Sequence, residues 1–380
     1  MDFDFTEEQR LLKESVDRLF ADSYGDFEQR KRHQDHPRGW SPALWGQYAE
    51  MGLLGLPFGE SQGGFGGGPV ETMIVMEAIG RGLAVEPYLA TVVLGGGFLR
   101  LTGREALIPA VAEGGATLAF AHTERQSRHD LFDVATTARR TEAGWVLDGA
   151  KNVVLHGDSA DHIILSARTA GARRDREGIS LFLLPADAPG LTRRGYPTQD
   201  GLRAAELLLE GVALPADALL GEEGAGLPLM ERVVDTALAA LCAEAVGAME
   251  ALHEMTIDYL KQRKQFGTSI GSFQAVQHRA ADMLVALEQA RSMSLYAAMM
   301  AEHPDPAVRR PAIAAAKALV NRSADLIGKE AIQLHGGIAM TMEYKAGHYF
   351  KRLSMLLNQF GDTDHHLRVV AEAGGLPEAA

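Results

Sequence analysis

The stretch YLKQRKQFGTSIGSFQAVQHRAADM, residues 259–283, joins two long segments that each have the composition of a helix. The segments Leu227–Arg263 and Ser272–His303 are rich in Ala, Leu and Met, residues that favour helices. The linker between them, FGTSIG, is short and carries two glycines, which interrupt a helical pattern. This stretch therefore predicts two long helices joined by a short link, as in a helical bundle.

Two further helical patterns follow towards the C-terminus, over Pro306–Gln333 and Lys345–Ala373. The links HPDP and HGGIAMTME precede them, and both contain residues that interrupt helices. Four long helices with short links predict a four-helix bundle. We expect this C-terminal bundle to occupy residues 226–380.

The first third of the chain also has helical patterns, and its first helix begins with a capping signal. Thr6 followed by Gln9 resembles a capping box. The run GGFGGG, residues 63–68, lacks the Gly-Lys-Ser/Thr of a phosphate-binding loop, so we interpret it as a bend between helices. We expect an all-helical domain over residues 1–115. Its helical segments are Pro42–Met51, Val70–Gly80, Pro87–Leu101 and an N-terminal one carrying Leu11, Leu12, Val16, Leu19 and Phe20 at helical spacing.

Between these helical regions the pattern changes to short β-branched or alternating stretches separated by turn signals such as EAG, HGD and APG. Nothing here alternates with helices as a dinucleotide-binding fold would. We expect an antiparallel β-barrel domain over residues 116–225, so the whole chain is predicted to be an α+β protein. The expected strands are Ala135–Arg140, Trp145–Leu147, Lys151–Leu155, His162–Ala167, Ile179–Leu184 and Glu206–Leu209.

Composition excludes several classes of function. The 46% hydrophobic and 23% charged content of this 380-residue chain is ordinary for a soluble protein of two or three domains. A net charge of −13 argues against nucleic acid or an anionic membrane as the main partner. The N-terminus has no secretory pattern, and Glu244 and Glu250 interrupt the most apolar window, Thr236–Met255. We expect a cytoplasmic protein without a membrane span, whose single cysteine, Cys242, is a core residue.

Two segments carry a family resemblance. Residues 259–283 contain Arg-Lys-x-Phe-Gly, then Phe-Gln-x-x-Gln-His, then Ala-Asp-Met; residues 333–353 read QLHGGIAMTMEYKAGHYFKRL. With the order of helical domain, β domain and bundle, these segments resemble the acyl-CoA dehydrogenase family over essentially the whole chain. Within that family, the N-terminus and TERQSRHDL, residues 123–131, are most similar to the small subunit of pimeloyl-CoA dehydrogenases.

The resemblance implies a reaction and a cofactor. Family members take the α-proton of an acyl-CoA thioester with a carboxylate, while FAD takes the β-hydrogen as hydride. An electron-transferring flavoprotein is the electron acceptor that the family implies. Members bind FAD across a subunit interface, so each chain has a half-site donated to its neighbour and a half-site of its own.

In the donated half, the resemblance implies that Arg263 pairs with the FAD pyrophosphate, because a guanidinium offers a fixed, permanently charged fork. The alternative is a solvated cation at a helix end beside Lys264. Gln265, Phe266, Ile270 and Gln274 match positions around the adenosine end, and Gln333, Leu334 and Gly337 match a turn where the backbone meets the cofactor.

The chain's own half departs from the family pattern. Family members have Thr-Glu followed by Gly-x-Gly-Ser-Asp, whose small residues let cofactor and thioester lie on the β domain. Here Thr123, Glu124 and Asp130 remain, with Thr123 as the implied flavin contact, but RQSRH lies between them and His129 stands at the serine position. Val153 and Leu155 replace a tryptophan and a hydroxyl-bearing residue. Bulky or charged replacements here are expected to crowd a bound ring.

The catalytic base is also missing from its family positions. The glutamate of the family's Tyr-Glu-Gly-Thr falls on Phe360 or Gly361, depending on where one inserted residue is placed. Some members carry the base on the first bundle helix instead, at the position of Ala237, where Leu238 follows in place of a common arginine. Asp362 is a weak substitute candidate, because a shift of one residue turns a helical side chain by about 100°.

Glu244, two turns from Ala237 on the same helix face, is a weaker candidate still. The alternative for Asp362, Asp364, His365 and His366 is a polar turn facing solvent or a subunit boundary. We expect no metal site, because adjacent histidines lack a spaced third ligand.

Three functional hypotheses remain open from the sequence. The first is a dehydrogenase subunit in a hetero-oligomer, such as a tetramer, that completes the FAD site of a base-bearing partner. The second is a self-sufficient homo-oligomeric dehydrogenase, or related flavoenzyme, with Asp362 as a relocated base. The third is a non-catalytic acyl-CoA-binding scaffold. The sequence does not specify whether the acyl chain is dicarboxylic, branched or steroid-derived.

Overall fold

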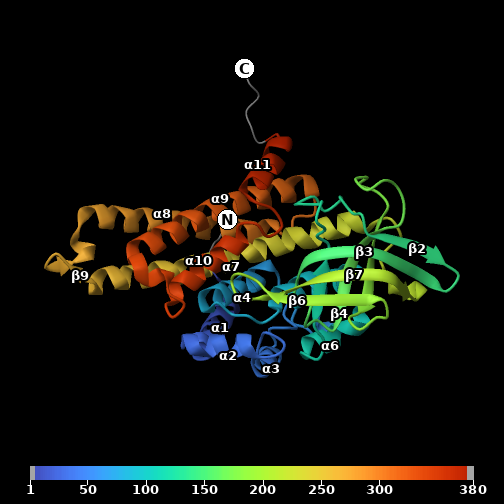
Figure 1. The fold of residues 1–380 in the computed structure, drawn as a ribbon, viewed down its shortest axis with the longest axis horizontal. Coiled ribbons are helices and arrows are strands. Elements are labelled where there is room, and N and C mark those ends of the chain that lie inside the picture. The colour runs from blue at the N-terminus through green and yellow to red at the C-terminus, as the bar shows by residue number, and fades with distance from the viewer. Residues whose placement is uncertain (1–4, 375–380) are drawn as a thin grey trace, which may run out of the picture. The chain divides into compact units, whose positions relative to one another are not determined.

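A computed structural model describes residues 5–374 of the chain (Figure 1). The chain divides into two compact units, and each is built from separate parts of the sequence. The first unit contains the residues up to Lys31, Pro69–Ala84 and the residues from Leu238 onwards. The second contains Arg32–Gly68 and Val85–Ala237. The units therefore cut across the linear order of helical, β and helical segments.

The predicted capping box at the N-terminus is confirmed. The Thr6 hydroxyl accepts a hydrogen bond from the Gln9 backbone N–H at 3.2 Å, and Gln9 Oε1 accepts one from Thr6 N–H at 3.0 Å. Helix α1, Glu7–Tyr24, starts there and packs against α4, Pro69–Gly82. The apolar spacing of the sequence thus becomes the buried face of α1, at Val16, Phe20 and Tyr24.

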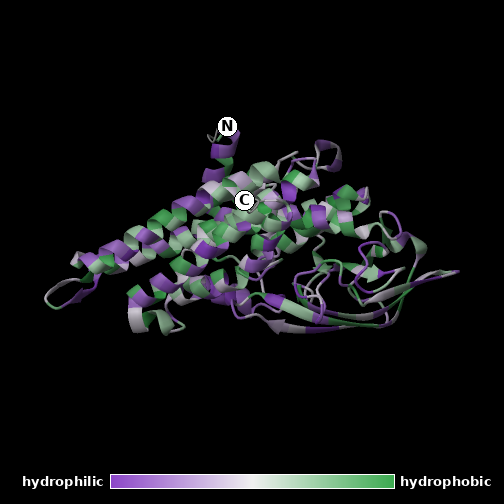
Figure 2. Cartoon of the chain, turned by 90° about the horizontal axis from the view of Figure 1, so that it is seen from above, coloured by the Kyte–Doolittle hydropathy of each residue, from purple (hydrophilic) through white to green (hydrophobic). Residues whose placement is uncertain are grey.

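Helices α8, Gln274–Met300, and α9, Pro306–His335, are longer than the N-terminal helices of the first unit. The pairs α8–α9, α9–α10 and α9–α11 pack against one another. Figure 2 shows hydrophilic and hydrophobic residues interleaved along these helices. Within residues 5–374, none of the helices combines the length and the apolar character that crossing a membrane would need. The bounds are α7 Gly226–Gln262, α8 Gln274–Met300, α9 Pro306–His335, α10 Lys345–Leu356 and α11 Thr363–Glu372, with α7 beginning in the second unit.

The prediction of one continuous helix over Lys345–Ala373 is wrong. Helix α10 ends at Leu356, and α11 begins only at Thr363. In the linker, Phe360 and Gly361 have φ angles of +57° and +127°, which a right-handed helix cannot contain. The polar run that looks helical in the sequence is thus a turn followed by a new helix.

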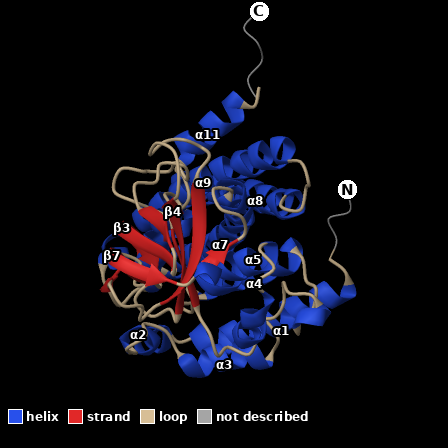
Figure 3. Ribbon diagram, turned by 90° about the vertical axis from the view of Figure 1, so that its right-hand side faces the viewer, coloured by secondary structure: helices blue, strands red, loops and turns tan. Residues whose placement is uncertain are grey.

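The middle segment forms a sheet in the second unit, but it is neither wholly antiparallel nor shown to close as a barrel (Figure 3). The strand order is β6-β7-β3-β2-β4-β5-β8, and β1 pairs with β4. Strands β1 and β2 both run parallel to β4, whereas the other pairings are antiparallel. Among the described residues β6 and β8 end the sheet without pairing with each other, so a closed barrel is not confirmed.

Within residues 5–374 the sheet has eight strands where six short stretches were expected, and some of the strands are longer than expected. The two short stretches on either side of Gly149 form one bulged strand, β3, because the bulges let the pairing with β7 resume after each irregularity. Strands β1, β6 and β8 were missed. The bounds are β1 Leu118–Ala121, β2 Thr137–Thr141, β3 Gly144–Leu155, β4 His162–Arg168, β5 Ile179–Pro185, β6 Leu191–Pro197, β7 Arg203–Leu214 and β8 Leu219–Leu220.

Among the short helices, those over Phe27–Asp35 and Ile108–Ala112 were not predicted, and one predicted helix is wound differently. Pro87–Leu101 was expected to be one helix, but its first part, Leu89–Gly95, is wound as a π-helix before α5, Gly96–Leu101. Thr91 in this segment binds the start of β1, since its hydroxyl accepts from Leu118 N–H at 3.1 Å. The remaining helices are α2 Phe27–Asp35, α3 Pro42–Glu50, α6 Ile108–Ala112 and the 3₁₀ turns Glu60–Gln62, Glu105–Leu107 and Ala216–Ala218.

A buried ion pair between Lys151 and Glu124 connects parts of the sheet. Lys151 Nζ lies 2.7 Å from Glu124 Oε1 and also donates to the Ser166 hydroxyl at 3.1 Å. Glu124 accepts backbone N–H groups of Ala135 and Thr136 as well. Burial raises the pKa of Glu124, but Lys151 and these hydrogen bonds outweigh burial and lower the pKa to about 2. The pair therefore joins β3, β4 and the segments before β2.

Removing one member of this pair tests its role. Lys151→Met leaves the Glu124 carboxylate buried without its cation, so we expect the free energy of unfolding to fall by about 3–5 kcal/mol. Lys151→Met combined with Glu124→Gln should recover much of that loss. Urea denaturation of the three proteins measures it. Equal stability of the single and double variants would contradict the coupling.

The same pair predicts an acid limit to stability. Since the folded pKa of Glu124 lies below its ordinary value, its contribution is complete above about pH 4.5 and is lost as the pH falls towards 2.

Candidate functional site

The stretch 259–283 folds into two helices joined by a tight hairpin. Helix α7 ends at Gln262, and the strands β9, Lys264–Gln265, and β10, Thr268–Ser269, pair antiparallel. The two residues between them, Phe266 and Gly267, have φ angles of +54° and +79°. A phenylalanine with positive φ is unusual and marks a constrained turn. The sequence predicted a link here but not a hairpin, because the usual Asn-Gly or Asp-Gly signal is absent.

The hairpin presents its predicted site residues to the outside. The Phe266 side chain is 92% exposed. Arg263 and Gln274 are also exposed, and within residues 5–374 neither side chain has a hydrogen-bond or ion-pair partner. The Gln265 side-chain amide donates to the neighbouring Lys264 carbonyl at 2.8 Å, and Ile270 is half-buried in the 3₁₀ turn Ile270–Ser272. The Arg263 guanidinium is therefore accessible and free of partners within residues 5–374, as a group that binds a ligand must be.

The second predicted segment lies at the end of α9. Gln333 is exposed and Leu334 is buried in the last helical turn, and Gly337 belongs to the 3₁₀ turn Gly336–Met340. A Cβ added at Gly337 would meet no atom of the described chain within 4 Å. The absence of a side chain there is therefore not required by packing within residues 5–374, which leaves room for a ligand against the backbone.

His335 at the end of α9 contacts Tyr259 near the end of α7, so it links the two predicted segments. The sequence analysis did not single out this residue, although it lies in the QLHGG run. Its ring lies 4.7 Å from the Tyr259 ring and 5.2 Å from the Tyr344 ring. Its Nδ1 is 2.8 Å from the Ala331 carbonyl oxygen, and burial lowers its pKa. The Tyr259 carbonyl accepts the Arg263 N–H at 2.8 Å. The end of α9 and the start of the hairpin thus share one aromatic cluster.

The remaining predicted flavin contact, Thr123, belongs to the other unit. It follows β1, and its hydroxyl lies 3.1 Å from His122 Nε2. The Thr123 carbonyl accepts the Asn152 N–H at 2.9 Å.

The segment after Thr123 is fastened by arginines of the β4–β5 loop. Arg174 lies 2.9 Å from a carboxylate oxygen of both Asp130 and Asp133, and Arg173 lies 3.1 Å from Asp133. The Arg174 and Arg176 guanidinium groups each lie 5.3 Å from the centre of the Phe132 ring. These contacts tie the segment after Thr123 to the β4–β5 loop.

The linker at the family's base position has no free carboxylate. The Asp362 side chain is the N-cap of α11 and accepts the His365 N–H at 2.8 Å. A Cβ added at Gly361 would lie 2.6 Å from the His365 ring and 2.7 Å from that of His366, so a glutamate does not fit there without rearrangement. The expected solvent-facing polar turn is wrong for His366, which is 2% exposed. Asp364 is exposed in the first turn of α11.

Two buried side chains of α9 hold the start of this linker. Lys317 Nζ donates to the Leu356 carbonyl at 2.7 Å and to Asn321 Oδ1 at 2.6 Å. Asn321 Nδ2 donates to the Leu357 carbonyl at 3.1 Å. These bonds satisfy carbonyl groups at the end of α10 that the helix itself leaves open. Burial lowers the pKa of Lys317 to about 8. The linker is therefore anchored at its first residues by Lys317 and Asn321.

The second position at which the resemblance implies a base, on α7, also lacks a free carboxylate among the described residues. Ala237 and Leu238 are buried along α7. Glu244 is buried and forms a two-pronged ion pair with Arg352, at 2.5 and 2.8 Å. The Arg352 guanidinium therefore engages both oxygens of the Glu244 carboxylate. Across residues 5–374, no three His, Cys, Asp or Glu side chains gather as a metal site would require.

Comparison with known proteins identifies the family. Models of the acyl-CoA dehydrogenase N-terminal, middle and C-terminal domains match residues 6–111, 119–212 and 224–375. The chain therefore belongs to the acyl-CoA dehydrogenase family, as its sequence indicated. Homologues are oxidoreductases that act on CH–CH groups, and FAD is their cofactor.

Three relatives illustrate the match. The chain is 32% identical over 354 residues to a probable acyl-CoA dehydrogenase, YngJ, of Bacillus subtilis, covering 90% of this chain and 92% of the relative. The FAD complex of PigA superposes with a TM-score of 0.89 at 27% identity, covering 99% and 100% of the two chains. The ChsE4–ChsE5 complex from Mycobacterium tuberculosis gives a TM-score of 0.87 at 25% identity, covering 100% of each chain.

Two substitutions at Asp362 separate a helix cap from a catalytic base. Asp362→Ser keeps a capping oxygen and removes the carboxylate, whereas Asp362→Ala removes both. We expect the serine variant to be as stable as the wild type and the alanine variant to lose about 1 kcal/mol in thermal unfolding. If dehydrogenation by the purified chain collapsed in the serine variant at unchanged stability, Asp362 would be a base after all.

Proposed function

We propose that this chain is a subunit of an FAD-dependent acyl-CoA dehydrogenase that completes the flavin site of a base-bearing partner and abstracts no proton itself. One observation carries the proposal: both family positions for the base lack a carboxylate, and the neighbouring Asp362 and Glu244 are bound in structural contacts. A general base must reach within about 3 Å of the proton it removes. No such group is available at these positions.

The residues of the donated half-site support a role for this chain in binding the FAD of its neighbour. Arg263 has a free, exposed guanidinium, which can pair with the pyrophosphate of FAD by two parallel hydrogen bonds. Gln274, Gln265 and Gln333 offer amide groups for the adenosine end, and Phe266 offers an apolar surface. FAD, when bound, supplies the acceptor of the β-hydrogen. This chain's part is to orient the cofactor for its neighbour.

The half of the FAD site that belongs to this chain's own β domain also supports the proposal that the flavin is bound by the partner. Glu124 faces Lys151 rather than a ligand, and Asp130 and Asp133 are bound by Arg174. The exposed Val153, with φ of +51°, stands where family members have a tryptophan. A flavin ring laid on this segment would meet charged side chains that are already paired. The residues present do not fit a second flavin here.

A hetero-oligomer reconciles the two halves. In a complex of two chain types, the partner would bring the carboxylate and the flavin bed, and this chain would bring Arg263. The ChsE4–ChsE5 complex, by its name an assembly of two different chains, is a structural precedent. The substrate class is an acyl-CoA thioester, with an electron-transferring flavoprotein as the electron acceptor. The similarity to pimeloyl-CoA dehydrogenase small subunits favours a dicarboxylic acyl chain.

Flavin retention tests the role of Arg263. The chain is tagged in its native host, the assembly is purified, and flavin per chain is measured by absorbance. Arg263→Gln removes the charged fork and should lower flavin retention at least tenfold. Lys264→Gln removes the adjacent exposed charge and should leave it unchanged. The wild-type assembly should also contain a second family member with Tyr-Glu-Gly-Thr.

Two results would contradict the proposal. The first is full turnover by a homo-oligomer of this chain alone. The second is an Arg263→Gln assembly that retains flavin like the Lys264→Gln control, which would favour a scaffold instead.

A further inference from the structure

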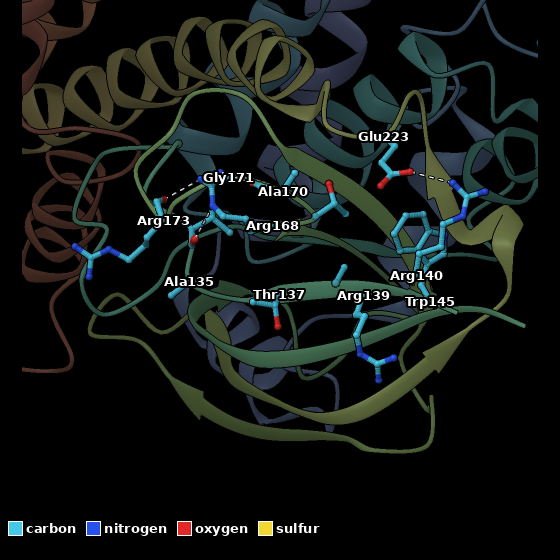
Figure 4. A pocket seen from close by; sticks show the side chains of 13 residues that line it. Ala135, Thr137, Arg139, Arg140, Trp145, Arg168, Ala170, Gly171, Arg173 and Glu223 are labelled. Carbon is cyan, nitrogen blue, oxygen red and sulfur yellow. Dashed lines mark hydrogen bonds and ion pairs between the residues drawn. The ribbon is translucent and has the colours of Figure 1, made fainter. Parts of the chain in front are cut away.

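Charged side chains in this protein are placed by two different means. At the cavity beside the outer edge of β2, the Arg140 guanidinium is held by other side chains: it forms an ion pair with Glu223 at 3.0 Å and lies 5.5 Å from the centre of the Trp145 ring (Figure 4). The Arg263 side chain has no such partner in residues 5–374. Its placement therefore depends on the backbone that carries it, and on the contacts that hold this backbone.

The hairpin that carries Arg263 is bonded directly to the end of α7. The Ser269 hydroxyl donates to the Leu260 carbonyl at 2.6 Å, which satisfies a carbonyl group that the end of the helix leaves open. The Arg263 carbonyl accepts the Ile270 N–H at 2.9 Å. Because the hairpin is bonded to the last turn of α7 in this way, Arg263 is placed by the position of that turn.

Three aromatic rings of the first unit join the last turn of α7 to the second flavin segment. Tyr259, whose carbonyl accepts the Arg263 N–H, has its ring centre 4.7 Å from that of His335 at the end of α9. The Tyr344 ring lies 5.2 Å from His335 and 6.4 Å from Tyr259, so His335 is the middle ring of the three. Tyr344 is the N-cap residue of α10, and the loop between His335 and Tyr344 contains Gly337.

The His335 ring is itself held in one orientation. It is 3% exposed, and its Nδ1 donates to the Ala331 carbonyl at 2.8 Å, because a carbonyl oxygen can only accept. Burial lowers the pKa of His335, so the ring is neutral at pH 7 and packs against the two phenol rings without the cost of a buried charge. Directly after it the chain leaves the helix at Gly336, with a φ angle of +64°. The ring is thus a fixed support at the start of the turn that contains Gly337.

We propose that His335 is a positioning residue for the flavin, whose ring sets the distance between Arg263 and the turn that contains Gly337. The inference rests on the proposed function, in which both segments bind the FAD of a neighbouring chain. A cofactor that is bound at two points is held tightly when the two points already have the right separation, because ordering them on binding costs free energy. This role requires no contact between His335 and the cofactor.

Flavin retention by the assembly purified from the native host tests this role, with thermal unfolding measured in parallel. His335→Ala removes the middle ring and should raise the rate of flavin loss about tenfold. His335→Phe keeps a ring between the two tyrosines and should bring retention back to within about twofold of the wild type. The matched control is Phe20→Leu, which alters a buried ring that packs on Tyr24 in the same unit and should retain flavin like the wild type.

A combined variant separates positioning from direct contact with the cofactor. If His335 acts through the placement of Arg263, His335→Ala should cause no further loss of flavin once Arg263→Gln is present. A residue that contacted the cofactor independently would add its own loss. Additive losses in the double variant therefore overturn the positioning role.

Limited trypsin digestion of the purified full chain gives a readout that needs neither flavin nor partner. The exposed hairpin offers cleavage sites after Arg263 and Lys264, and cleavage there requires local opening of the hairpin. His335→Ala should raise the cleavage rate at these bonds about threefold or more. His335→Phe and Phe20→Leu should be cleaved like the wild type.

Unchanged hairpin cleavage in His335→Ala overturns the inference, as does unchanged flavin retention. An equal effect of Phe20→Leu also overturns it, because the loss would then follow from general destabilisation. If the wild-type assembly holds no flavin, the proposed function fails, and the trypsin result alone decides whether His335 holds the hairpin in place.

Discussion

The close approach of α4 and α7 is the constraint on which the first unit depends. A side chain at Gly80 would overlap the Glu244 carbonyl, and one at Gly247 would overlap the Glu77 carbonyl. Two glycines facing each other allow the helix backbones to touch, which brings flanking charged side chains within bonding distance. Arg81 then pairs with Glu250 and Glu254, while Arg291 of α8 pairs with Glu77 and Glu250. The glycines thus allow the two helices to touch, and the ion pairs then fix their positions along each other.

The proposed function depends on which polar side chains already have partners within the chain and which do not. Carboxylates near the expected base positions are occupied, Asp362 by the N-terminus of α11 and Glu244 by Arg352. Cationic and amide groups on the hairpin and at the end of α9 point outwards without partners in the described chain, as Arg263 and Gln333 do. A proton acceptor must be free and a cofactor ligand must be accessible. Arg263 and Gln333 meet the second condition, whereas Asp362 and Glu244 are held in structural contacts and do not meet the first.

Sequence patterns predicted the elements whose signals are local. The capping box at Thr6 and the helices α7, α8 and α9 were found within a few residues, because amphipathic spacing and breakers act over one or two turns. The strands β1, β6 and β8 were missed, since β1 is uniformly apolar and β6 largely polar and exposed. Such segments become strands only through partners distant in sequence. The parallel pairing of β1 and β2 with β4 was not predicted either, because it also depends on partners distant in sequence.

The sequence by itself determined the family and the absence of a carboxylate at the two positions where the resemblance implies a base, because both depend only on which residues follow one another. Tertiary structure decided what the nearby groups do instead. Asp362 caps a helix because Phe360 and Gly361 turn the chain with positive φ, and His366 is buried against that turn. The linking of Arg263 to the end of α9 through Tyr259 and His335 likewise needs two helices packed side by side. Spacing along a chain cannot fix such contacts, since they depend on how distant segments fill the same space.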